Sequence, residues 1–81
     1  MRIYDRFAMV MVSERIGRLI RERRRFLRLR QRDLAELAGV TLRGLTELEN
    51  GRGNPTVSQL SKIAGVLGLE VTLSERRHAE G

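Results

Sequence analysis

The 81-residue sequence contains no cysteine, no tryptophan, one histidine, one proline and only 4% aromatic residues. Without cysteine, neither a disulfide framework nor a thiolate metal site can form, which is typical of a reducing compartment. The apolar run at residues 7–12 is too short to span a membrane and does not end in a secretory cleavage pattern. We therefore expect a protein of the cytoplasm or nucleoid, without cofactor, metal or membrane contact.

The sequence also lacks the residue combinations of an active site. His78 is the only histidine, and no nucleophile–base pair or metal-ligand spacing occurs elsewhere. A chain of this length forms one small domain with a modest core, so association with a second copy would help it to bury apolar surface. These features predict a binding protein rather than an enzyme.

Lysine is almost absent, since Lys62 is the only one among 16 basic residues, yet the formal net charge is +6. Nine arginines lie between residues 15 and 32. Their planar guanidinium groups suit phosphate oxygens, which favours a nucleic-acid partner. A solvated helix face is the alternative, because four acidic residues lie among or just beyond these arginines: Glu14, Glu22, Asp33 and Glu36. RNA also remains open on charge alone, but the few aromatic residues offer no stacking platform.

Apolar periodicity predicts four helices, at residues 13–27, at 31–38, at 41–49 and from a capping box at Thr56 and Gln59 to Gly68. The second and third form a tight unit. Gly39 makes the turn between them, Val40 follows it into the core, and Thr41 is placed to cap the third helix. Two such short helices are stable only as part of a larger bundle, which would hold the third helix rigidly.

The segment from Gln31 to Gly51 resembles the Cro and phage-repressor class of helix-turn-helix proteins, the Xre family. The resemblance extends over about residues 15–69. Its most specific part consists of Gln31, Ala35, Gly39 and the motif Leu45-x-x-Leu48-Glu49-Asn50-Gly51. It implies a mainly α, lambda-repressor-like bundle of four helices that binds double-stranded DNA. A generic helical hairpin with a glycine turn is the alternative.

Beyond the fourth helix the periodicity changes. Leu69, Val71 and Leu73 alternate with polar residues, which predicts a half-buried β-strand at 69–74. This ending resembles HipB-type antitoxins, and that resemblance implies a strand that pairs with its copy in a homodimer and a HipA-type kinase as toxin partner. A frayed tail is the alternative. Residues 75–81 are expected to be disordered, and residues 1–12 to form either a strand or an extension of the first helix.

The spacing and the family pattern place base contacts on the first turn of the third helix and one turn later, at Leu42, Arg43, Thr46 and Glu47. Arg43 suits guanine, Leu42 a thymine methyl group and Glu47 a cytosine amino group. For Arg43 the alternative is a phosphate contact, and for Glu47 rejection of wrong bases or pairing with a nearby arginine.

Phosphate contacts are expected on both sides of that helix. The resemblance places Gln31, Asn50 and Arg52 on the DNA backbone, and we add Arg30 and Thr41 to this set. It also implies that Arg24 and Glu49 form a buried ion pair, rather than two separate surface charges.

Three residues depart from the family pattern: Arg28 stands where a glycine usually ends the first helix, Arg30 where Ser or Thr caps the second, and Gly44 lies inside the third. The two arginines either lower stability or change the conformation of the turn between the first and second helices. Gly44 would let the third helix approach a backbone closely.

Together these features predict a homodimeric, sequence-specific repressor that binds an inverted-repeat operator, in its most specific form the autoregulating antitoxin of a toxin–antitoxin pair. The alternative is a bridging module that binds proteins and makes no base-specific contacts.

Overall fold

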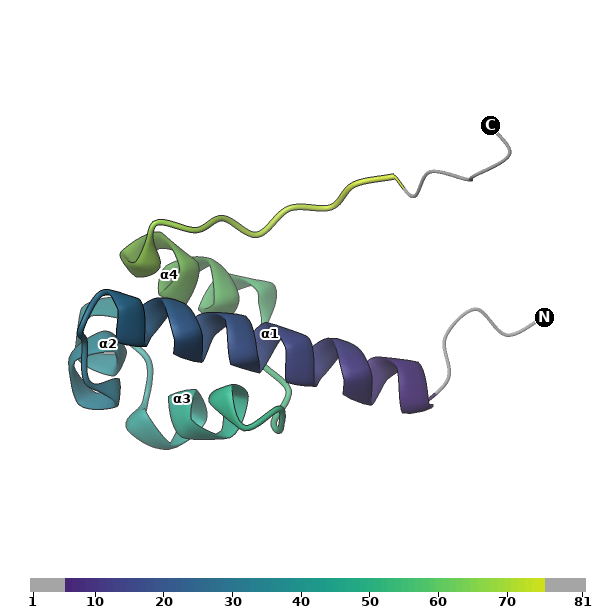
Figure 1. Ribbon diagram of the computed structural model, residues 1–81, viewed down its shortest axis with the longest axis horizontal. Helices are drawn as coiled ribbons and strands as arrows, with labels where there is room; N and C mark the ends of the chain where they lie inside the picture. Colours follow the sequence, from purple (N-terminus) through teal and green to yellow (C-terminus); the bar gives the residue numbers. More distant parts are fainter. Residues whose placement is uncertain (1–5, 76–81) are drawn as a thin grey trace.

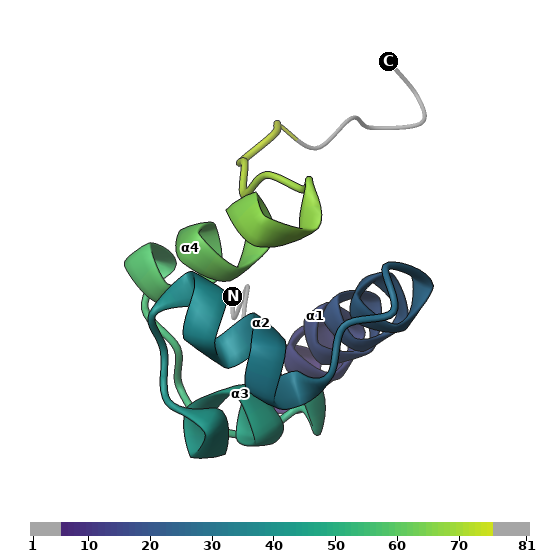
Figure 2. The same cartoon turned by 90° about the vertical axis from the view of Figure 1, so that its left-hand side faces the viewer.

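The computed structural model describes residues 6–75, which contain four helices: α1 (Arg6–Phe26), α2 (Gln31–Ala38), α3 (Leu42–Glu49) and α4 (Val57–Leu67). α1 packs against α3 and α4, and α2 packs against the same two helices. Figure 2 shows α2 between α4 above and α3 below, with α1 along one side. No helix in this part of the chain is long and apolar enough to cross a membrane.

The core lies where the four helices meet. Its largest fully buried apolar side chains are Leu34, Leu45, Ile63 and Leu67, one or two from each of α2, α3 and α4. Ile20 of α1 and Leu48 of α3 complete this cluster. Because α3 contributes two leucines to the core, its rotation about its own axis is fixed, and so is the face that it exposes.

Short-range signals set most helix ends. Gly39 and Gly68 adopt left-handed φ angles of 70° and 74° at the ends of α2 and α4. The Thr56 hydroxyl accepts from the backbone N–H of Gln59 at 3.0 Å, and the Gln59 side chain accepts from that of Thr56 at 2.9 Å. The expected ranges of the second, third and fourth helices therefore agree with the structure to within one residue.

The first helix starts before residue 13, in agreement with one of the two alternatives for the N-terminal segment. α1 begins at Arg6 instead of residue 13, so residues 6–12 extend the helix and do not form a strand. Ser13 and Glu14 resemble a capping start, but nothing in the apolar run before them interrupts helical hydrogen bonding. The run extends away from the bundle (Figure 1). Residues 1–5 of the expected N-terminal segment lie outside the described part.

The predicted C-terminal strand is contradicted. Residues 69–75 carry no regular secondary structure, and no β-strand occurs among residues 6–75. Leu69 packs against the core and donates its backbone N–H to the Ala64 carbonyl at 2.8 Å, but the Leu73 side chain is 98% exposed. Alternation of apolar and polar residues can indicate that an extended segment has one apolar side. A β-strand also needs a second strand for its backbone hydrogen bonds. No such strand lies beside residues 69–75 in the described part of the chain. Residues 76–81 lie outside the described part.

The turn between α1 and α2 keeps a left-handed residue even without glycine. Arg28 has a φ of 60°, the one positive φ outside glycine among the described residues. The backbone N–H of Leu29 donates to the Arg24 carbonyl at 3.0 Å, and that of Arg28 donates to the Arg25 carbonyl at 2.9 Å. The turn therefore has the hydrogen bonds of a glycine-ended helix while carrying a side chain that disfavours this conformation.

We expect Arg28→Gly to raise the free energy of unfolding by up to about 1 kcal/mol, because glycine adopts a left-handed φ without steric cost. Urea denaturation followed by circular dichroism measures this change. Arg25→Gly is the control: Arg25 lies inside α1, where glycine should instead destabilise. A destabilised Arg28→Gly variant would contradict the assigned strain.

Candidate nucleic-acid interface

α3 has one anchored face and one open face. Leu45, Leu48 and Glu49 are buried, whereas Leu42, Arg43 and Gly44 are exposed at its first turn. The side chain of Arg43 is 89% exposed. The helix therefore presents its N-terminal turn to solvent from a rigid base, as the sequence predicts.

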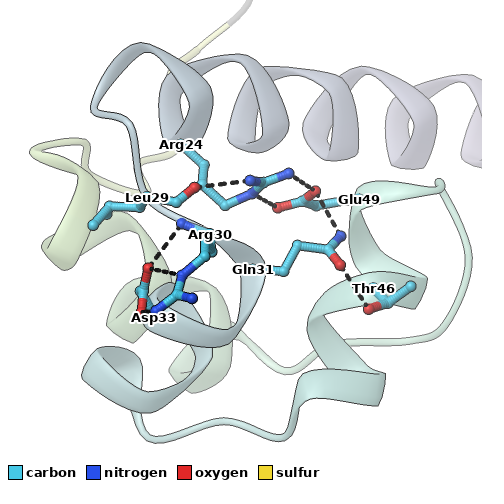
Figure 3. Close-up of polar contacts among 7 residues, drawn as sticks. All are labelled: Arg24, Leu29, Arg30, Gln31, Asp33, Thr46 and Glu49. Atoms are coloured by element: carbon cyan, nitrogen blue, oxygen red, sulfur yellow. Dashed lines mark hydrogen bonds and ion pairs between the residues drawn. The ribbon is translucent and has the colours of Figure 1, made fainter.

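A buried ion pair forms much of that base (Figure 3). Arg24 Nε donates to Glu49 Oε2 at 2.7 Å and its Nη2 donates to Oε1 at 2.9 Å, so the pair is bidentate. Arg24 Nη1 also donates to the Leu29 carbonyl at 2.9 Å. The hydrogen bonds to Glu49 raise the pKa of Arg24. This pair, which the family resemblance implied, links α1, α3 and the turn before α2.

Gln31 extends the network from the ion pair to the open face of α3. Its Nε2 donates to Glu49 Oε1 at 3.0 Å, and its Oε1 accepts from the Thr46 hydroxyl at 3.3 Å (Figure 3). Both ends of the Gln31 amide are therefore occupied by protein groups, and the Thr46 proton points back toward α2. The sequence did not predict these contacts, because they depend on how α2 and α3 are placed against each other.

Arg43 and Glu47 lie on the same face, one turn apart. Arg43 Nε is 3.7 Å from Glu47 Oε2, and the Glu47 side chain is half-buried. An exposed pair of this kind is weak, so a stronger partner can draw Arg43 away. The pair places a donor fork and an acceptor side by side on the surface of α3.

The expected phosphate-contact residues surround this face, but they differ in whether their side chains already bind other protein groups. The Thr41 hydroxyl accepts from the backbone N–H of Gly44 at 3.0 Å, which caps α3. Arg30 donates to Asp33, whose carboxylate accepts from the Arg30 backbone N–H at 3.0 Å and from its guanidinium at 3.0 and 3.1 Å. Asn50 and Arg52 are exposed at the far end of α3.

Asp33 supplies one half of a capping box at the start of α2, because its carboxylate accepts from the backbone N–H of the N-cap residue Arg30. A guanidinium has no acceptor, but the Asp33 carboxylate satisfies the backbone N–H before α2 from within the helix. The same hydrogen bonds from Arg30 lower the pKa of Asp33. Sequence analysis missed this role, although a carboxylate three residues after a cap position is a recognisable signal.

Gly44 has a local explanation. A Cβ at this position would lie 2.9 Å from the Thr41 hydroxyl oxygen that caps α3. Glycine at this position therefore leaves space for the Thr41 hydroxyl. This explains the glycine without a close approach of α3 to another backbone.

The sequence profile of the helix-turn-helix family matches residues 20–73. A 10 kDa protein of the ImmF control region of Bacillus phage phi105 is 32% identical over 61 residues, which are 75% of this chain and 68% of that protein. An uncharacterised HTH-type transcriptional regulator of Methanothermobacter thermautotrophicus is 46% identical over 52 residues, 64% of this chain and 75% of the regulator. The immunity repressor of phage phi105 is 37% identical over 57 residues, 70% of this chain but only 40% of the repressor.

The chain belongs to the helix-turn-helix family, in the Xre class. Family and relatives support DNA-binding transcriptional regulation as the general class of function. They do not confirm the closer resemblance to HipB-type antitoxins. That resemblance depended on the C-terminal strand, which the structure contradicts.

Proposed function

We propose that the chain is a sequence-specific transcriptional repressor that binds double-stranded DNA with the open face of α3. The observation that carries the proposal is the division of α3 into a buried face, held by Leu45, Leu48 and the Arg24–Glu49 pair, and an exposed first turn with Arg43. A helix exposed in this way can enter the major groove, and the net charge of +6 favours the approach of a polyanion.

Within that face we assign base contacts to Leu42, Arg43, Thr46 and Glu47. Arg43 leaves its weak pair with Glu47 and donates two hydrogen bonds to guanine, and Glu47 accepts from a cytosine amino group. Leu42 packs on a thymine methyl group. Since the Thr46 hydroxyl donates to Gln31, its oxygen faces DNA as an acceptor.

The phosphate contacts fix the position of α3 in the groove. We assign them to Arg30, Gln31, Thr41, Asn50 and Arg52. The amide of Gln31 is held by Glu49 and Thr46, so Gln31 contributes through its backbone N–H in the first turn of α2, where a helix attracts anions. Arg52 contributes as an exposed charge.

The repressor is proposed to act as a homodimer on an inverted repeat, since two copies related by a two-fold axis match a symmetric operator. An immunity repressor and a control-region protein are among its relatives. We include no toxin partner and no kinase in the proposal, because the relatives give no support for a toxin–antitoxin pair.

Titration of duplex DNA by fluorescence anisotropy at several salt concentrations tests this function. If a dimer makes about eight phosphate contacts, log K should fall with log salt with a slope of about −7. Duplexes with two half-sites one helical turn apart, or a multiple of it, should bind more tightly than the same half-sites at other spacings. Equal binding to all duplexes would contradict sequence-specific recognition of DNA.

Two arginines should separate base recognition from phosphate binding. We expect Arg43→Ala to cost about 1–3 kcal/mol on the preferred operator and to relax specificity at one base pair. Arg52→Ala should weaken all duplexes alike and reduce the salt slope by about one unit. Equal losses on operator and random duplex with Arg43→Ala would remove Arg43 from the base contacts.

A further inference from the structure

An exposed stripe runs along α1 on the side away from the core. Its members are spaced alternately by three and four residues, and all of them are exposed: Val12, Arg15, Leu19, Glu22 and Phe26. This spacing is that of the contact seam of a coiled coil. The Leu19 side chain is 54% exposed and that of Phe26 is 73% exposed, although both are large and apolar.

The buried side of α1 is separate from this stripe. Gly17, Ile20 and Arg24 face the other helices. A shallow hollow lies along the stripe, bordered by Val12, Arg15, Ile16, Arg18, Leu19 and Glu22. Among the described residues, the Arg23 guanidinium lies over the Phe26 ring, 5.3 Å from its centroid, but Val12, Leu19 and Phe26 remain largely exposed.

We propose that this stripe, the α1 seam, is the surface through which two copies of the chain form a homodimer, with the two α1 helices antiparallel. The sequence of the seam is self-complementary about Leu19. An antiparallel copy places Leu19 against its counterpart, Val12 near the second Phe26, and Arg15 near the second Glu22, each twice. A two-fold interface requires this kind of matching.

The charges of the α1 seam favour a second copy of the chain as the partner, and they favour the antiparallel orientation of the two helices. In a parallel pair, each Arg15 would face an arginine and each Glu22 a glutamate, which is unfavourable. The antiparallel pair replaces both repulsions with attraction. A polyanion is a poor occupant of the same surface, because Glu22 and three apolar side chains are part of it.

The position of the seam also suits the proposed function, on which this step rests. In Figure 2, α1 lies at one side of the bundle and α3 at the bottom. Consider a two-fold axis that is vertical in that view and passes beside α1. Rotation about this axis makes the second α1 antiparallel to the first. It also leaves both copies of α3 on the same lower face of the dimer. The dimer would then present two recognition helices to one side of a DNA duplex.

Sedimentation velocity of the full chain from about 1 to 100 µM tests the seam. We expect a reversible dimer, with a dissociation constant raised at least about tenfold by Leu19→Glu, because a carboxylate would then be buried against its counterpart. Leu37→Glu is the matched control, since Leu37 is also an exposed helical leucine (64%) but belongs to α2. The control should associate like the wild type, and circular dichroism should show unchanged helicity in both variants.

Charge reversal tests the direction. Arg15→Glu alone should weaken the dimer, and the double change Arg15→Glu with Glu22→Arg should restore it to within about threefold of wild type, because the pairs are reversed but intact. A wild-type chain that stays monomeric, equal effects of Leu19→Glu and Leu37→Glu, or a double variant weaker than the single one would overturn the inference. A monomer that still selects a DNA sequence would overturn the seam and the proposed homodimer, but would leave sequence-specific DNA binding by α3 standing. A seam-dependent dimer without sequence preference would support the seam and contradict the function.

Discussion

Replacing Glu49 with alanine is expected to lower the free energy of unfolding by about 3–5 kcal/mol, because it leaves the Arg24 guanidinium buried without its charge partner. The Glu49 side chain is 1% exposed and accepts three hydrogen bonds, two from Arg24 and one from Gln31. Its loss therefore also frees Gln31 and, through it, Thr46. Urea denaturation followed by circular dichroism measures the effect.

Glu36→Ala provides the control, since Glu36 is an exposed glutamate on α2 and its loss should change stability by about 0.5 kcal/mol or less. A second variant, Arg24→Met with Glu49→Leu, removes both charges and fills their space. It should lose less stability than Glu49→Ala, because no unpaired charge remains. A Glu49→Ala protein as stable as the Glu36→Ala control would show that the pair does not brace α3.

Gly17→Ala is expected to destabilise the chain by about 2–3 kcal/mol through the contact between α1 and α3. A Cβ at Gly17 would lie 2.3 Å from the carbonyl oxygen of Leu48 and 3.0 Å from that of Glu49. Both neighbours are backbone atoms, so no side chain can turn away and the two helices must separate. DNA binding should weaken as well, because α3 would move relative to α2.

Gly65→Ala is a matched control within α4, where a Cβ would meet nothing within 4 Å. Alanine is favoured over glycine inside a helix by about 1 kcal/mol, so this variant should be stabilised. The two substitutions therefore have the same chemistry and opposite expected signs. Stabilisation of both variants in thermal denaturation would mean that α1 and α3 are not in close contact at Gly17.

The sequence predicted those parts of the fold that depend on near neighbours along the chain. Gly39, Thr41 and the Thr56–Gln59 box mark helix ends through backbone conformation and local hydrogen bonds, and the ends lie where these residues predict them. The sequence does not decide the start of α1, because Ser13 and Glu14 form a plausible start, while helical structure continues through the apolar residues before them.

The remaining errors concern contacts between distant segments. The alternation at residues 69–74 predicted a strand, but pairing depends on a partner that periodicity does not reveal. The sequence also did not predict the contacts of the Gln31 amide, because the packing of α2 against α3 places it between Glu49 and Thr46. Family resemblance supplied the pairing of Arg24 with Glu49, which spacing alone would not have indicated.

Selection from a pool of random-sequence duplexes, carried out in parallel with the wild type and Arg43→Ala, tests the central claim most directly. The wild type should enrich an inverted repeat bound about 10³-fold or more tightly than random DNA near physiological salt. Arg43→Ala should enrich a related motif in which one base pair of each half-site is no longer selected. A wild-type selection that converges on no motif would contradict the assignment of α3 as a sequence-specific DNA-binding helix.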